Sequence, residues 1–121
     1  MGNDYERARS SVDYMSSNVS MCVDPGVCKF KTKITTTYDD GVVHFEFVTD
    51  CPYVKKLPEV IKDGLDPFEA LKMPFSTNPV YVACGKVLAH SACPIPSAMI
   101  KSVEAAAGLG LKRPVRFDFD C

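Results

Sequence analysis

The sequence predicts an α+β fold in which a small, mostly antiparallel sheet is covered on one face by two to three helices. Two patterns of apolar residues indicate this fold. Residues 29–48 alternate between apolar or β-branched and polar side chains, which is typical of a half-buried β-hairpin. Residues 96–107 place apolar side chains every three to four positions, which is typical of an amphipathic helix. A chain of 121 residues is long enough for one domain with a small core.

Composition restricts the classes of protein that this sequence can encode. The chain has 14 basic and 15 acidic residues, so it lacks the bulk positive charge expected of a nucleic-acid-binding protein. No apolar run approaches the roughly 20 residues that a membrane-spanning helix needs. The first ten residues are polar and do not form a secretion signal. We therefore expect a cytoplasmic protein with no membrane partner and no nucleic-acid partner.

The first twenty residues differ from the rest of the chain. Residues 1–20 contain five serines and no strong apolar period, which favours an N-terminal arm that is flexible or docks on another surface. Ordered structure is expected to begin near Cys22. Residues 21–121 are then expected to form a single cysteine-rich domain.

The hairpin is the clearest predicted element. Asp39-Asp40-Gly41 reverses the chain, because Gly41 is free to adopt a positive φ, and residues 42–48 form the return strand. The first strand alternates between two sets of side chains. One set is expected to face the core and consists of Phe30, Thr32, Ile34, Thr36 and Tyr38.

Prolines and glycines predict where the helices begin and end. Pro52 suits the first position of a helix that ends at Gly64, although Pro58 must either kink this helix or move its start later. Asp66 is placed to cap a second, short helix, with Glu69 positioned for a reciprocal cap. Residues 80–83 fit either a strand or a turn of helix.

The last third of the chain contains the best predicted helix and a predicted final strand. In the helix at residues 96–107, Met99 and Val103 face inward and Gly108 ends it. The segment Val115–Phe119 alternates again and predicts an apolar edge strand. Together with the arm at residues 1–20, this strand offers a docking surface, so the expected partner is another protein or a second copy of this chain.

Six cysteines are the most informative residues for function: Cys22, Cys28, Cys51, Cys84, Cys93 and Cys121. In a reducing compartment, such thiols are typical of metal ligands, redox groups or buried small residues rather than disulfides. Cys51 and Cys93 each precede a proline at an expected helix start. The free N–H groups and the dipole of a helix N-terminus favour thiolate, so we expect these two thiols to be the most acidic.

The predicted topology brings the cysteines together. The outer ends of an antiparallel hairpin lie side by side, so Cys28 and Cys51 are expected to be neighbours at one edge of the sheet. Four thiolates suit either an iron–sulfur cluster or zinc, and the spacing does not distinguish the two because it contains no CxxC motif. The candidate metal ligands are Cys28, Cys51, Cys84 and Cys93, with His90 and Cys22 as additional candidates.

Two other functions stay open at this point. In a metal-free thiol redox protein, Cys51 or Cys93 would attack a disulfide and a neighbouring thiol would resolve it. In a non-catalytic accessory or interaction subunit, the cysteines would only fill the core. The sequence contains no GxGxxG, P-loop or HExxH motif, and it predicts no catalytic residue.

The order of short motifs in residues 26–107 resembles that of a known domain. The motifs are Cys28-Lys29-Phe30, Asp40-Gly41, Cys51-Pro52, Gly64, Asp66 to Leu71, Cys84-Gly85 and Cys93-Pro94. This order resembles the cysteine-rich TSCPD domain, which occurs alone in small proteins and at the C-terminus of some vitamin B12-dependent ribonucleotide reductases. The resemblance implies an α+β fold with helices on one face of a small sheet.

The same layout more loosely resembles the U-type iron–sulfur scaffold proteins. In those proteins the cysteines that correspond to Cys28, Cys51 and Cys93 hold the cluster, so the resemblance implies a role in iron–sulfur handling. Two features of the scaffold differ here. Its aspartate tied to cluster release is replaced by Phe30, and its chaperone-recognition segment is absent from residues 87–90.

Overall fold

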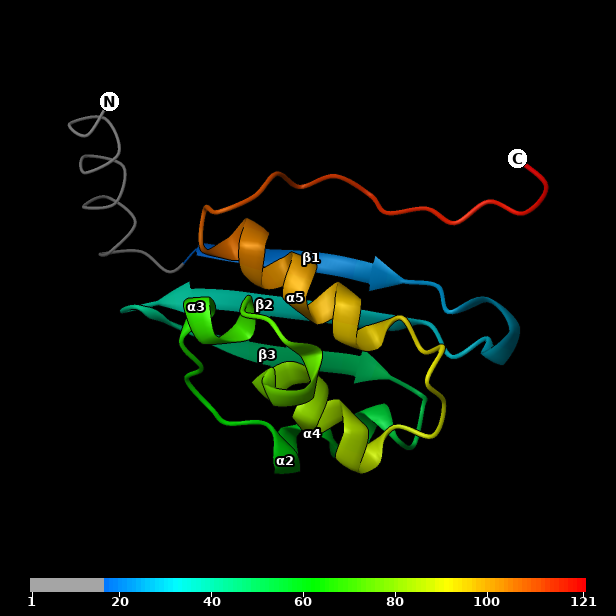
Figure 1. The fold of residues 1–121 in the computed structure, drawn as a ribbon, viewed down its shortest axis with the longest axis horizontal. Coiled ribbons are helices and arrows are strands. Elements are labelled where there is room, and N and C mark those ends of the chain that lie inside the picture. The colour runs from blue at the N-terminus through cyan, green and yellow to red at the C-terminus, as the bar shows by residue number, and fades with distance from the viewer. Residues whose placement is uncertain (1–16) are drawn as a thin grey trace.

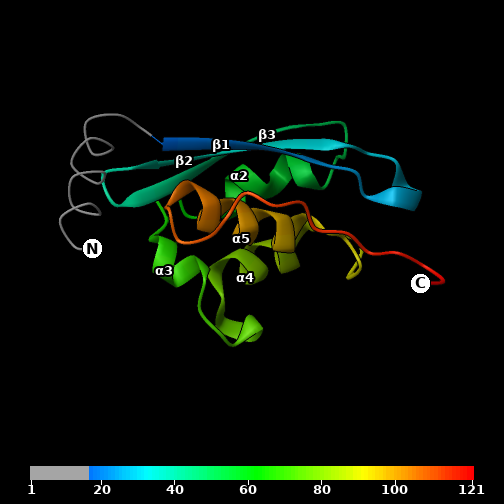
Figure 2. The same cartoon turned by 90° about the horizontal axis from the view of Figure 1, so that it is seen from above.

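Three antiparallel strands form the sheet of the computed structural model, which describes residues 17–121. The strands are β1 (Ser17–Val23), β2 (Thr32–Asp39) and β3 (Val42–Thr49), and they lie in the order β1-β2-β3 (Figure 1). The helices all lie on the same face of this sheet (Figure 2). The predicted α+β fold class is confirmed.

The central hairpin forms as predicted. β2 and β3 pair from Thr32↔Thr49 at the open end to Asp39↔Val42 at the turn. Asp40 and Gly41 both have positive φ, 52° and 80°, which matches the twist of a tight hairpin turn. Thr32, Ile34 and Thr36 are buried on the helix side, whereas Phe30 precedes the strand and is exposed.

The first strand was not predicted. β1 begins at Ser17, so the expectation that ordered structure starts near Cys22 is wrong, and residues 17–20 of the expected arm belong to the sheet. Val19 and Val23 bury their side chains, and this alternation is the signal that the surrounding serines obscured. Residues 1–16, the rest of the expected arm, lie outside the described residues.

The helix expected from Pro52 to Gly64 is shorter and starts later. A 3-10 turn, η2 (Val54–Lys56), leads into α2 (Leu57–Val60), and Pro58 occupies the first turn of α2. Proline is tolerated there because the N–H groups of the first turn have no partner inside the helix. Ile61 is already extended, with ψ 140°, so the helix ends before Gly64.

A short helix and a 3-10 turn precede the two longer helices. α3 (Pro67–Ala70) starts at Asp66, whose Oδ1 accepts the Phe68 N–H at 2.8 Å, as predicted. The expected reciprocal cap by Glu69 does not form, because Glu69 pairs with Lys72 at 2.9 Å instead. The 3-10 turn η3 (Phe75–Thr77) follows.

Asn78 explains why the ambiguous residues 80–83 are helical. They belong to α4 (Pro79–Val87), and the Asn78 Oδ1 accepts the N–H groups of Val80 and Tyr81 at 2.9 and 3.3 Å. The Asn78 Nδ2 donates to the carbonyl oxygens of Ala70 and Lys72 at 2.8 and 3.0 Å. This buried side chain therefore starts α4 and ties it to the end of α3.

The predicted C-terminal helix is confirmed as α5 (Ile95–Ala106). It packs on β1 and β2, and Met99 and Val103 are fully buried. A buried hydrogen bond of 2.6 Å joins Ser102 of α5 to Thr36 of β2. This bond fixes the position of the helix along the strand. The core around these contacts contains Ile34, Val43, Val54, Leu57, Val80 and Cys84.

The predicted final strand is wrong. Residues 115–119 form no strand, and the chain after α5 runs past β1 and α5 without ladder pairing (Figure 1). Alternation alone does not make a strand, since the backbone groups also need a partner edge. Phe117 and Phe119 are 84% and 95% exposed.

Candidate functional site

Four chain segments that carry cysteines meet at the end of the sheet where β3 stops. They are the 3-10 turn η1 (Gly26–Cys28) before β2, the loop after β3, the C-terminal half of α4 and the loop that leads into α5 (Figures 1 and 2). These segments carry Cys28, Cys51, Cys84 and Cys93, respectively. The order of the strands and helices thus brings the segments that carry the four predicted ligands to the same end of the sheet.

The open end of the hairpin positions Cys28 and Cys51. Thr32 and Thr49 pair across this end, and their hydroxyl oxygens lie 2.8 Å apart. The Thr49 Oγ1 also accepts the backbone N–H of Cys51 at 3.1 Å, which turns the chain immediately after β3. Cys28 precedes Lys29, whose positive φ of 66° redirects the chain toward β2. Both cysteines therefore flank the same strand pair, as the sequence predicted.

Cys84 is the buried member of the group. It is 3% exposed, and its thiol donates a weak hydrogen bond to the Met99 thioether, with the sulfur atoms 3.9 Å apart. Burial, together with a smaller contribution from the nearby Cys93, raises the pKa of the Cys84 thiol to about 12. Cys84 is therefore a neutral thiol at physiological pH unless a cation compensates its charge.

Cys93 is the thiol that interacts with the other three. Burial raises the pKa of Cys93, a hydrogen bond from the Ile95 N–H lowers it, and the charges of Cys51 and Cys28 raise it again. Its charge also acts on Cys84. Because such interactions require proximity, Cys28, Cys51 and Cys84 all lie within electrostatic reach of Cys93.

The expectation that Cys93 would be an acidic thiol is wrong. The Ile95 N–H does favour thiolate, as predicted for a helix start, but burial acts more strongly, and the neighbouring thiols add to its effect. The expectation of an acidic Cys51 thiol rested on a helix that begins at Pro52, and no helix begins there. The first α-helix after Pro52 begins only at Leu57, so Cys51 does not lie at an α-helix N-terminus.

The four thiols are gathered but not arranged for coordination. Within residues 17–121, no group of three or more cysteine, histidine, aspartate or glutamate side chains is positioned to hold a metal ion. Cys28 is exposed, and Cys51 and Cys93 are half-buried. All three lie outside α-helices, where side chains and loops adjust more easily than in the core.

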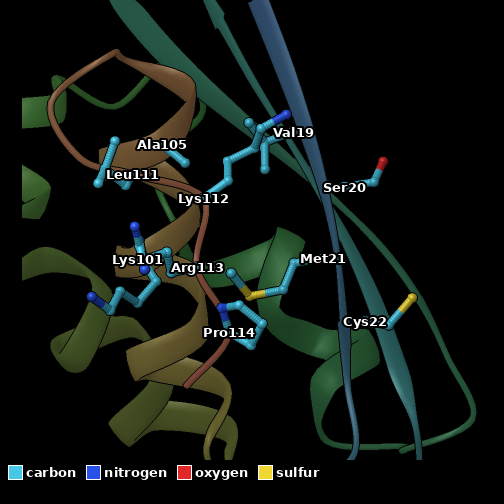
Figure 3. A pocket seen from close by; sticks show the side chains of 10 residues that line it. All are labelled: Val19, Ser20, Met21, Cys22, Lys101, Ala105, Leu111, Lys112, Arg113 and Pro114. Carbon is cyan, nitrogen blue, oxygen red and sulfur yellow. The ribbon is translucent and has the colours of Figure 1, made fainter. Parts of the chain in front are cut away.

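The two additional candidate ligands occupy different positions. Cys22 lies on β1 opposite Lys33, and its side chain points away from α5, unlike that of Met21 (Figure 3). His90 is exposed in the loop before α5, where its carbonyl oxygen accepts the Cys93 N–H at 3.2 Å. His90 thus supports Cys93 through its backbone, and Cys22 lies on the opposite face of the sheet from the helices.

Two residues near the thiols were missed in the sequence. Thr49 orients Cys51 through its hydroxyl group, and a threonine two residues before a cysteine is a recognisable local turn pattern. Met99 contacts Cys84 from α5, but no spacing rule connects residues on two separate helices.

The fold and the gathered thiols define a small α+β protein with a cysteine cluster at one end of its sheet. The chain belongs to a family of unknown function, DUF6951, whose model matches residues 19–119. No curated protein and no solved structure matches the chain. No helix in the described part of the chain, residues 17–121, has the length and apolar character needed to cross a membrane.

Proposed function

We propose that this protein binds a thiolate-ligated metal centre, an iron–sulfur cluster or zinc, through Cys28, Cys51, Cys84 and Cys93. One observation carries the proposal: Cys93 lies within electrostatic reach of the other three thiols. Four cysteines from four separate segments meet at one end of a small sheet. Four thiolates are the ligand set that both kinds of centre use.

The electrostatics of the group favour a cation. Without metal, burial and mutual repulsion raise the pKa values of Cys84 and Cys93 and keep these thiols protonated. A bound metal cation removes both penalties, since it deprotonates its thiol ligands and screens their charges from one another. Binding therefore releases protons and becomes tighter as the pH rises.

Coordination requires limited rearrangement. Cys84 is fixed by α4 and by its contact with Met99, so it acts as the buried ligand. Cys28, Cys51 and Cys93 lie on irregular segments and would rotate toward the metal. We expect metal binding to order these segments, because ligands drawn to one ion constrain the loops that carry them.

The exposure of the site favours an iron–sulfur cluster over structural zinc. Structural zinc sites are closed, whereas Cys28 is exposed and Cys51 and Cys93 are half-buried. An open site suits a cluster that is assembled or passed on in iron–sulfur handling. The looser resemblance to U-type scaffolds leads to the same expectation and stays a prediction.

The other two functions have weaker support. A redox cysteine reacts as thiolate, and the raised pKa of Cys93 leaves it protonated near neutral pH. A purely structural role fits Cys84, which is buried, but not Cys28, which is exposed. Metal binding accounts for both residues in one site.

Cysteine alkylation with peptide mapping tests the proposal on the full chain. Metal-loaded protein is treated with iodoacetamide, in parallel with protein stripped by a chelator. We expect metal to protect Cys28, Cys51 and Cys93, while Cys22 and Cys121 react equally in both samples and serve as internal controls. Equal labelling of Cys28 in both samples, at stoichiometric metal, would overturn the assignment. The buried Cys84 is assigned separately by the metal content of Cys84→Ala.

A further inference from the structure

The chain after α5 exposes a regular apolar pattern. Val115, Phe117 and Phe119 are 53%, 84% and 95% exposed, and they alternate with Arg116 and Asp118. This segment lies within the part of the chain that the family model matches. Large apolar side chains at alternate positions of an extended segment are the pattern of a strand that buries one face, and here that face is uncovered.

The sheet offers an unprotected edge to such a strand. β1 is at one end of the strand order, and within residues 17–121 the backbone groups along its outer edge have no ladder partner. Exposed edges usually carry a charged residue or a proline that prevents pairing with other chains. The seven residues of β1, SNVSMCV, contain neither. This edge is therefore open to an added strand.

A groove lies directly beside the β1 edge. It lies between β1, α5 and the residues that follow α5 (Figure 3), and its volume is about 270 Å³. Pockets for small ligands start at roughly 300 Å³, so this groove suits a few side chains better than a small molecule. The lining residues that determine which side chains the groove can accept are Val19, Met21, Lys101, Ala105, Lys112 and Arg113.

The groove and the exposed segment are complementary in charge as well as in polarity. Lys101, Lys112 and Arg113 line the groove, and none of the described residues that line it is acidic. The exposed segment carries Asp118 and Asp120 beside its apolar side chains. The segment also carries Arg116, whose Nη2 lies 3.1 Å from the Asp118 Oδ1, so its side chains sum to one negative charge. An apolar strand with this charge matches an apolar groove with three cationic side chains.

We propose that residues 115–121 of one copy pair with the β1 edge of a second copy, and that the exchange is reciprocal. Residues 111–114 already line the groove of their own copy, and the segment beyond them extends past α5 without pairing to β1 (Figure 2). A second copy supplies both an exposed segment and an open edge. In a two-fold symmetric dimer, each segment therefore covers the β1 edge of the other copy.

The exposed phenylalanines supply about half of the area that a stable dimer buries. A buried phenylalanine covers on the order of 150–250 Å². Phe117 and Phe119 from two copies thus provide about 600–1,000 Å², before the β1 edges and the groove walls are counted. Stable interfaces bury about 1,200–2,000 Å² over both partners.

Light scattering after size-exclusion chromatography tests the proposal on the full chain. The buffer contains a reductant so that exposed cysteines do not cross-link copies. We expect twice the chain mass of 13.3 kDa for the unaltered protein and a monomer for Phe117→Asp/Phe119→Asp. The matched control is Phe68→Asp, which alters a 68% exposed phenylalanine on α3 and is expected to stay dimeric.

A mixing experiment tests the reciprocal exchange. Ala105→Glu places a charge in the groove, so this variant is also expected to be monomeric, with circular dichroism confirming its fold. When the two variants are mixed, Ala105→Glu supplies an intact segment and the phenylalanine double variant supplies an intact groove. We therefore expect the mixture to form a heterodimer. A monomeric unaltered protein at 100 μM (about the concentration where micromolar affinities saturate), a dimeric double variant or a mixture without heterodimer would each overturn the proposal.

Discussion

The Cys84 thiol lies 3.9 Å from the Met99 thioether sulfur, and this contact joins α4 to α5 inside the core. Both residues are almost fully buried, at 3% and 0% exposure. The buried member of the cysteine cluster is thus held by helix packing, while Cys28 and Cys51 depend on turns at the end of the hairpin. The candidate site combines one rigid ligand with ligands that adjust.

The stability of the metal-free protein is expected to fall in alkaline solution because of Cys84. Its folded-state pKa of about 12 is above the ordinary value of 9.0, so the folded state keeps a proton that the unfolded chain releases. The stabilising effect is complete below pH 9 and is lost as the pH rises toward 12. Between these limits the free energy of unfolding falls by about 1.4 kcal/mol per pH unit from this group.

Urea denaturation at pH 8 and pH 10 measures this effect. The comparison is between the unaltered chain and Cys84→Ala, which lacks this thiol, so that every other pH effect is common to both proteins. We expect a smaller pH dependence for the variant. An identical dependence in the two proteins would mean that Cys84 is not shielded from water.

Asn78→Ala is expected to destabilise the fold strongly. The Asn78 side chain makes four hydrogen bonds that start α4 and hold the end of α3, and it is 2% exposed. Its loss leaves buried backbone groups without partners, which costs about 2–4 kcal/mol in the free energy of unfolding. Thermal or urea denaturation measures the loss, with the exposed Asn18→Ala on β1 as the matched control. Similar stabilities for the two variants would contradict the role assigned to Asn78.

Thr49→Val is expected to weaken metal binding while the protein stays folded. The variant keeps the shape of the side chain but removes the hydroxyl that accepts the Cys51 N–H. Groups that orient metal ligands typically contribute about 10- to 100-fold in affinity. A competition titration against a chromophoric chelator measures the affinity.

The control for this experiment is Thr37→Val. Thr37 lies on the same β2–β3 hairpin, opposite His44 and away from the cysteine end. We expect this variant to bind metal like the unaltered chain. Equal affinities for the Thr49 and Thr37 variants would show that the orientation of Cys51 does not matter.

The sequence predicted the elements whose signals are local. The hairpin of β2 and β3 was predicted because alternation and the Asp40-Gly41 turn both act over a few residues. α5 was predicted from its apolar period. In contrast, residues 115–119 carry the same alternation and form no strand, because pairing depends on an edge that local sequence does not reveal.

The candidate ligands were chosen from the sequence and stay a prediction, and their electrostatics could not be predicted. Hairpin geometry was enough to expect Cys28 and Cys51 at the same end of the strand pair, where Thr32 pairs with Thr49. The pKa of Cys93 could not be predicted, because its burial depends on how the loop before α5 packs. The contact between Cys84 and Met99 likewise depends on the packing of α4 on α5.

The metal and acid-labile sulfide content of the chain, purified without oxygen, shows whether the four cysteines bind a metal centre. We expect a thiolate-bound centre: iron with sulfide and absorption near 400 nm (roughly where thiolate-to-iron bands fall), or stoichiometric zinc. We also expect that the variant with serine at Cys28, Cys51 and Cys93 loses this metal, whereas Cys22→Ser/Cys121→Ser keeps it. A folded chain that carries neither metal, with all six thiols free, would contradict the account.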